Sequence, residues 1–130
     1  MPVRKNFFLI IIIILLGYNC NIAGDCKNHI LLTIYNNSKT LKIVKFDRGC
    51  GATTSNNIQL SLLKFSDSLS NEAGNIFISD SPVGGYTDKD KSIQASWFND
   101  NTIKITYPKE LQVFKKDSIV NNFKVIYEAK

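Results

Sequence analysis

The feature that most constrains the fold is a period-two alternation of apolar and polar residues in the second half of the chain. Ile103, Ile105 and Tyr107 alternate with Lys104 and Thr106. The same pattern places one apolar face on segments 92–98 and 123–127, formed by Ile93, Ala95, Trp97, Phe123, Val125 and Tyr127. Successive side chains of a strand point to opposite faces, so the pattern predicts strands with one face on a core. No window keeps a helical 3.6-residue period over three turns, and the predicted fold is therefore all-β.

Short β-branched segments separated by polar clusters fill the rest of the chain after residue 25. We expect strands over 29–35, 40–46, 58–65, 75–79, 92–98, 103–107 and 123–127, and either a short edge strand or a turn of helix at 111–114. Residues 36–39 and 99–101 have the composition of hairpin turns. The pattern predicts a small, mostly antiparallel sandwich or half-barrel of about seven strands.

Segment 58–65 differs from the other predicted strands because it is apolar on both faces. Ile58, Leu60 and Leu62 share one face, and Leu63 and Phe65 lie on the other. Such a strand is either central and covered twice or interrupted by a bulge.

The first nineteen residues have the order of an export signal. Arg4 and Lys5 precede an unbroken apolar run over 7–16. Ten apolar residues span only about 15 Å as a helix, which is too short for a permanent transmembrane helix. We therefore expect a cleaved signal-peptide helix over 1–19, a tether over 20–28 and one β domain over 29–130.

Cys20 follows the apolar run at the position of the lipidated cysteine in bacterial lipoprotein signals, after Gly17 and Asn19. This predicts a membrane-anchored lipoprotein whose mature chain begins at Cys20. The alternative is ordinary cleavage near Ala23 or Gly24, which yields a soluble periplasmic or secreted protein without Cys20. Both place the protein in the cell envelope or beyond it.

Charge also bears on the partner class. The formal net charge is +5, and removal of the signal peptide with its two basic and no acidic residues lowers it to +3. A net charge this small, spread along the sequence, does not predict the concentrated basic surface that binds nucleic acid. One His and no closely spaced Cys pair offer no transition-metal set, and we expect neither a metal nor a cofactor.

The other two cysteines are expected to form a disulfide. Cys26 stands at the start of the first predicted strand, and Cys50 at the end of the second. These two ends lie close together in a hairpin, and the glycines that flank Cys50 permit the tight backbone that a bridged loop needs. A bridge over a loop of this length contributes about 3–4 kcal/mol in the chain-entropy picture.

Residues 50–54 read CGATT, after a DCKN segment at 25–28 and before an NEAGNIF segment at 71–77. With Trp97 and a last strand that ends at Tyr127, this order resembles a group of small bacterial exported proteins that carry a CGATT signature. The resemblance covers residue 25 to about residue 128. It implies a small β domain behind a lipoprotein-type or secretory signal, and it implies no known activity.

Polar residues around the predicted disulfide form a candidate binding loop. Its members are Asp47, Arg48, Thr53, Thr54 and Glu72. Arg48 is suited to hold a carboxylate or phosphate, but internal pairing with Asp47 or Glu72 is the favoured interpretation.

We expect a non-enzymatic binding or interaction module of the cell envelope, held by its lipid anchor and facing another envelope protein. One version is an immunity or inhibitor protein against an envelope effector. A less favoured alternative is an enzyme that uses Cys50, with His29 as its base, or the Asp47, Arg48 and Glu72 cluster.

Overall fold

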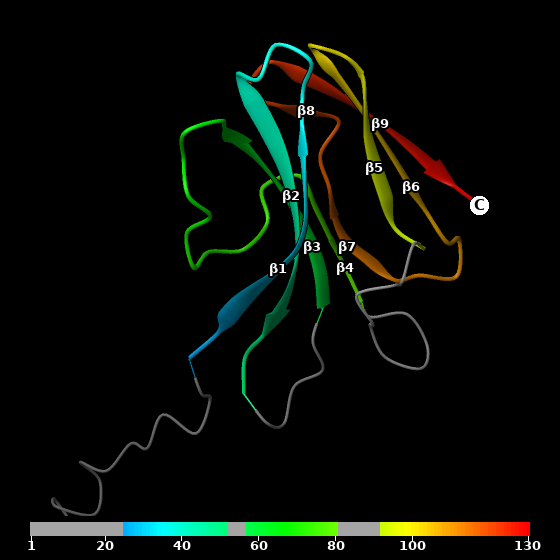
Figure 1. Cartoon of the computed structure of the whole chain (residues 1–130). Coiled ribbons are helices and arrows are strands. Elements are labelled where there is room, and N and C mark those ends of the chain that lie inside the picture. Colours follow the sequence, from blue (N-terminus) through cyan, green and yellow to red (C-terminus); the bar gives the residue numbers. More distant parts are fainter. Residues whose placement is uncertain (1–24, 52–56, 81–91) are drawn as a thin grey trace, which may run out of the picture.

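A computed structural model of the chain describes residues 25–51, 57–80 and 92–130. These residues form an all-β fold with nine strands and no helix (Figure 1). The strands are β1 Lys27–Tyr35, β2 Leu41–Gly49, β3 Asn57–Lys64, β4 Phe77–Ser79, β5 Gln94–Asn99, β6 Thr102–Tyr107, β7 Val113–Lys116, β8 Ile119–Val120 and β9 Phe123–Ala129. The predicted fold class is confirmed, and the expected seven strands are corrected to nine in the described part of the chain.

The strands form two sheets that pack as the layers of a sandwich (Figure 1). The five-stranded sheet has the order β1-β2-β3-β4-β7 and is antiparallel throughout. The four-stranded sheet has the order β5-β6-β9-β8, and only its β6–β9 pair is parallel. β1 begins at Lys27, so the last residues of the predicted tether already belong to a sheet.

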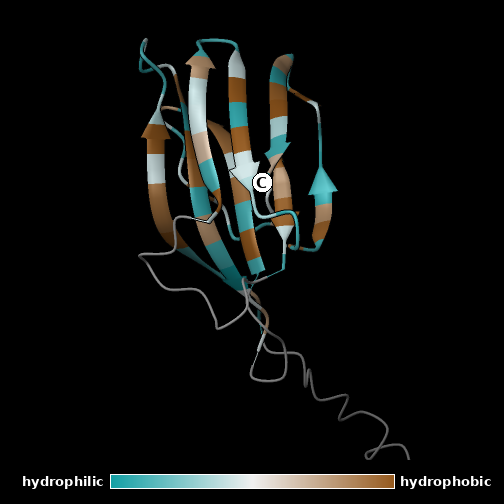
Figure 2. Cartoon of the chain, turned by 90° about the vertical axis from the view of Figure 1, so that its right-hand side faces the viewer, coloured by the Kyte–Doolittle hydropathy of each residue, from teal (hydrophilic) through white to brown (hydrophobic). Residues whose placement is uncertain are grey.

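The core lies between the sheets, where the predicted apolar faces meet. Ile103 and Ile105 are fully buried, and Tyr107 is nearly so. Figure 2 shows hydrophilic and hydrophobic residues alternating along the four-stranded sheet, as the period-two pattern requires. Trp97 packs against the same core, and its indole Nε1 donates a hydrogen bond to the Ile34 carbonyl oxygen at 3.3 Å. This bond joins the edge strands β5 and β1 of the two sheets.

β3 is covered on both faces, as the sequence of segment 58–65 allowed. Its inner residues Ile58, Leu60 and Leu62 face the other sheet in the core. On its outer face Gln59 and Ser61 are also buried, because segment 65–76 folds back over the five-stranded sheet. The backbone N–H of Gly74 donates to Gln59 Oε1 at 2.6 Å in this cover.

β7 and β8 are the two strands that the alternation pattern did not resolve. β7 is an edge strand beside β4, which decides between the strand and the helical turn expected at 111–114. β8 has two residues and returns to β9 through Asn121 and Asn122. Both asparagines have positive φ values, 48° and 68°, as residues of a two-residue type I′ turn do.

The sandwich has two distinct ends. The disulfide end carries Cys26 and Cys50, and the opposite turn end carries the β1–β2, β5–β6 and β8–β9 turns (Figure 1). At the turn end Ser38 Oγ lies 3.5 Å from Asp100 Oδ1, and the Lys124 N–H donates to the Asn101 carbonyl oxygen at 3.1 Å. The three turns are thus neighbours, one strand length away from the disulfide.

Candidate functional site

The predicted disulfide between Cys26 and Cys50 is present, with an S–S distance of 2.06 Å. Lys27 pairs with Gly49 in the β1–β2 ladder, so the two cysteines occupy the next opposed position. The bridge therefore closes the open end of the hairpin. A disulfide in a small domain indicates an oxidising, extracytoplasmic location. Cys20 and the predicted signal peptide lie outside the described residues.

Arg48 lies on the outer face of β2 at the disulfide end and is held by internal partners. Its Nη1 donates to Asn28 Oδ1 at 2.6 Å and to the Asn71 carbonyl oxygen at 3.2 Å. These partners are neutral groups and not the carboxylates of Asp47 or Glu72 that the sequence suggested. The guanidinium joins β1, β2 and segment 65–76 in one network.

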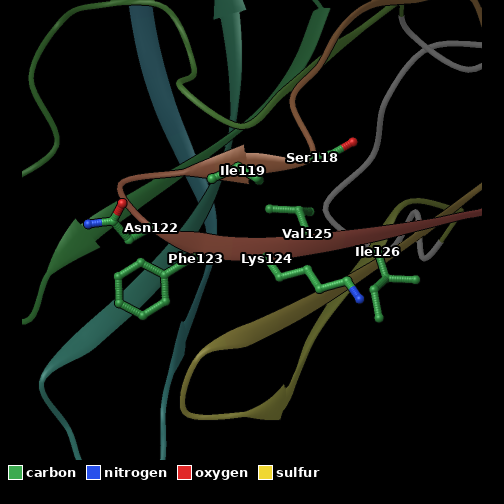
Figure 3. A pocket seen from close by; sticks show the side chains of 7 residues that line it. All are labelled: Ser118, Ile119, Asn122, Phe123, Lys124, Val125 and Ile126. Carbon is green, nitrogen blue, oxygen red and sulfur yellow. The ribbon is translucent and has the colours of Figure 1, made fainter.

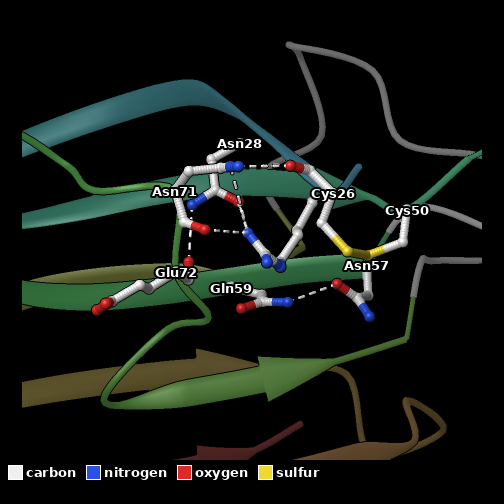
Figure 4. The surroundings of a disulfide bond; sticks show 8 residues. Cys26, Asn28, Cys50, Asn57, Gln59, Asn71 and Glu72 are labelled. Carbon is white, nitrogen blue, oxygen red and sulfur yellow. Dashed lines mark hydrogen bonds between the residues drawn. A yellow bond between two sulfur atoms is a disulfide. The ribbon is translucent and has the colours of Figure 1, made fainter. Parts of the chain in front are cut away.

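The same network fastens segment 65–76 by its backbone. Asn28 Nδ2 donates to the carbonyl oxygens of Ser70 and Glu72, at 3.0 and 2.7 Å. Asn71 Nδ2 donates to the Cys26 carbonyl oxygen at 2.6 Å, beside the disulfide. Glu72 contributes only its carbonyl to these bonds, and its carboxylate points away from Asn28 and Asn71 (Figure 4).

Asp47 belongs to the opposite face of the same strand. It pairs across the sheet with Ile58, a core residue, and its Oδ1 lies 3.6 Å from His29 Nδ1. Neighbouring residues of a strand face opposite sides, so Asp47 and Arg48 do not share a site. Thr53 and Thr54 lie outside the described residues. Of the three described members of the predicted binding loop, Arg48 and the backbone of Glu72 share one network through Asn28, and Asp47 lies on the other face of the sheet. The sulfur of Cys50 is bonded to Cys26, so the oxidised protein holds no thiolate there for His29 to activate.

Two open grooves lie beside the β8–β9 turn, a region that the sequence analysis did not single out. The outer groove has a volume of about 620 Å³ and is lined by Ser118, Ile119, Asn122, Phe123, Lys124, Val125 and Ile126 (Figure 3). The mouth groove, at the turn end of the sandwich, has a volume of about 430 Å³ and is lined by Leu41, Leu62, Leu63, Lys64, Asn121 and Phe123. Phe123 lines both grooves.

The walls of both grooves are mainly apolar, and each groove is lined by one lysine side chain. Ile119 is 73% exposed although it belongs to a strand. Lys124 lines the outer groove and Lys64 the mouth groove, and the described lining residues of the two grooves include no acidic side chain. This chemistry suits an apolar group that stands next to an anion. The sequence signal for this region was the Asn121-Asn122 pair between two short apolar runs, which is typical of a tight hairpin.

No helix in the described ranges is long and apolar enough to cross a membrane. Comparison of the chain with protein-family models, with curated proteins and with solved structures gave no match.

Proposed function

We propose that the protein is a lipid-anchored, non-enzymatic binding module of the cell envelope that engages its partner at the outer and mouth grooves. The observation that carries this proposal is the position of the two grooves. They lie beside the β8–β9 turn, whereas the chain enters the domain at the disulfide end. A module held at one end by its tether is free to meet a partner with the other.

The cysteine pairing supports the anchor. The chain has three cysteines, and the bridge between Cys26 and Cys50 leaves Cys20 as the remaining one. Cys20 is the residue that a lipoprotein signal would present for acylation. The likeness to small exported proteins with the CGATT signature agrees with this assignment.

The grooves favour a partner of defined chemistry. An apolar side chain or chain segment would contact Ile119 and Phe123, and a neighbouring carboxylate or phosphate would pair with Lys124 or Lys64. Another envelope protein can offer both groups on one surface. An immunity or inhibitor protein would use the same surface to cover its effector. The grooves are better placed for this role than the loop around Arg48, whose guanidinium is engaged inside the domain.

Site-specific photocrosslinking in intact envelopes tests the proposal. A photoreactive amino acid at position 119 should give one discrete adduct. The same group in place of Phe114, which is 58% exposed on β7 and lines neither groove, should give none. Lys124→Glu should reduce the adduct, and Lys115→Glu should not. Equal labelling from both positions, or labelling from neither, would contradict the assignment.

A further inference from the structure

β1 is the longest of the four edge strands in the described sheets. The other edge of its sheet, β7, has four residues and ends in Lys115 and Lys116, while β8 has two residues. Short length and lysines are the devices that usually keep a sheet edge from pairing further. β1 has nine residues, and Lys27 at its first position is its only Lys, Arg, Asp or Glu.

Two apolar side chains in the middle of β1 are about half exposed. Ile30 is 51% exposed and Leu32 is 49% exposed. A strand added at this edge would cover both, because cross-strand neighbours on one face pack against each other. Among the described strands, none pairs with β1 on the side away from β2. An added strand would hydrogen-bond to the backbone of this edge and would also cover its apolar side chains.

A β-bulge in β1 restricts which neighbour fits. Ile30 stands opposite Phe46 and Leu32 opposite Lys45, so Leu31 is the extra residue. The bulge interrupts the alternation of faces. The outer face takes Asn28, Ile30, Thr33 and Tyr35, and the core side takes His29, Leu31, Leu32 and Ile34.

The sequence of outer-facing and core-facing side chains along β1 is symmetric about the midpoint between Leu31 and Leu32. Opposed residues of two paired strands point to the same face of the sheet. The side chains of a regular strand alternate between faces without interruption, so such a strand can meet this condition on only one side of the bulge. A second, antiparallel β1 carries its own bulge at the same place. It matches the faces on both sides.

We propose that β1 pairs antiparallel with β1 of a second copy of this chain, about a two-fold axis between Leu31 and Leu32. In this register Ile30 faces Thr33 of the other copy, Leu31 faces Leu32, and Asn28 faces Tyr35. Lys27 falls opposite Asn36, so no two like charges oppose each other. The pair joins two five-stranded sheets into one continuous sheet, an isologous contact of the kind that closes a dimer. The inference stands independently of the proposed binding grooves, because none of their lining residues belongs to β1.

Native mass spectrometry of the protein purified from its own membranes tests the pairing. The unmodified protein should be a dimer. Ile30→Lys should raise the dimer dissociation constant at least about tenfold. The substitution occurs once in each copy of the two-fold dimer, so two apolar contacts are lost. Phe114→Lys, an equally drastic change at an exposed residue of β7 that lines neither groove, should leave the dimer intact.

The register is tested by charge compensation. Thr33→Glu added to Ile30→Lys should restore the dimer, since the new carboxylate faces the new ammonium of the other copy. Tyr35→Glu added to Ile30→Lys should not restore it, since Tyr35 faces Asn28. Should Ile30→Lys impair folding, hydrogen exchange of the unmodified protein decides the question: the amides of β1 gain protection with rising concentration and those of β7 do not. A monomer at all concentrations, a dimer that withstands Ile30→Lys, or a β1 edge occupied by a different protein would overturn the proposal.

Discussion

Arg48 donates a 2.6 Å hydrogen bond to the side chain of Asn28, the residue directly opposite it in the β1–β2 ladder. Asn28 in turn binds two carbonyl groups of segment 65–76, at Ser70 and Glu72. This pair therefore couples the outer face of the five-stranded sheet to the segment that covers it. The relationship makes Arg48 a structural residue of the domain.

Arg48→Met should lower the free energy of unfolding by about 1–2 kcal/mol, because Asn28 and Asn71 lose a charge-assisted donor. Chemical denaturation measures this loss, and hydrogen exchange should show that the amides of segment 65–76 open more often. Lys109→Met, at an exposed lysine, is the matched control. Unchanged stability together with loss of partner binding would instead assign Arg48 to a ligand.

Removal of the disulfide by the joint change Cys26→Ser and Cys50→Ser should cost about 3–4 kcal/mol of stability, the loop-closure term for a separation of 24 residues. Chemical reduction of the unmodified protein should produce a similar shift of the denaturation midpoint. Cys20→Ser should leave that midpoint in place. A double variant as stable as the parent would show that the bridge does not support the hairpin.

Gly74→Ala should destabilise the domain by about 1–3 kcal/mol through steric overlap. A Cβ at this position would lie 2.8 Å from the Leu60 carbonyl oxygen and 3.0 Å from that of Phe77, and neither backbone group can turn away. The neighbouring change Ala73→Ser, at an exposed residue, should have little effect on the thermal midpoint. Equal midpoints for the two variants would contradict the close approach of segment 65–76 to β3.

We expect the folded domain to lose stability at alkaline pH because of the buried hydroxyl of Tyr127. Burial, reinforced by the negative charge of Asp117, raises the pKa of its hydroxyl above the usual value of 10.0, and that hydroxyl donates to the carbonyl oxygens of Asp117 and Ile76 at 2.7 and 3.1 Å. Above pH 10 the unfolded chain releases a proton that the folded protein retains, so stability is complete below that pH and falls as the pH rises further. Tyr127→Phe should lose about 1 kcal/mol at neutral pH and show a shallower decline above pH 10. Parallel pH profiles for the two proteins would argue against this origin.

The alternation pattern predicted the strands that build the core, because there one face of each strand meets the opposite sheet. Ile103, Ile105 and Val125 lie inside as expected, and segment 58–65 is central. Periodicity carries no information on strand order, so the parallel β6–β9 pair was not predicted. β8 is too short for any period, and the four residues of β7 are too few for their pattern to decide between a strand and a turn of helix.

The candidate site was predicted less well than the fold. The pairing of Cys26 with Cys50 followed from hairpin geometry and is confirmed. The grouping of Asp47 with Arg48 relied on nearness in sequence, but neighbouring residues of a strand face opposite sides. The grooves beside the β8–β9 turn are formed by residues of four strands, β2, β3, β8 and β9, together with the turn itself and Ser118, and these meet only in the folded chain.

Intact mass spectrometry of the protein isolated from its native membranes tests the central claim of an envelope module anchored at Cys20 and closed by one disulfide. We expect the mass of residues 20–130 with added acyl chains and two hydrogens fewer than the reduced chain. An unacylated chain that begins after Cys20, or free thiols at Cys26 and Cys50, would contradict it.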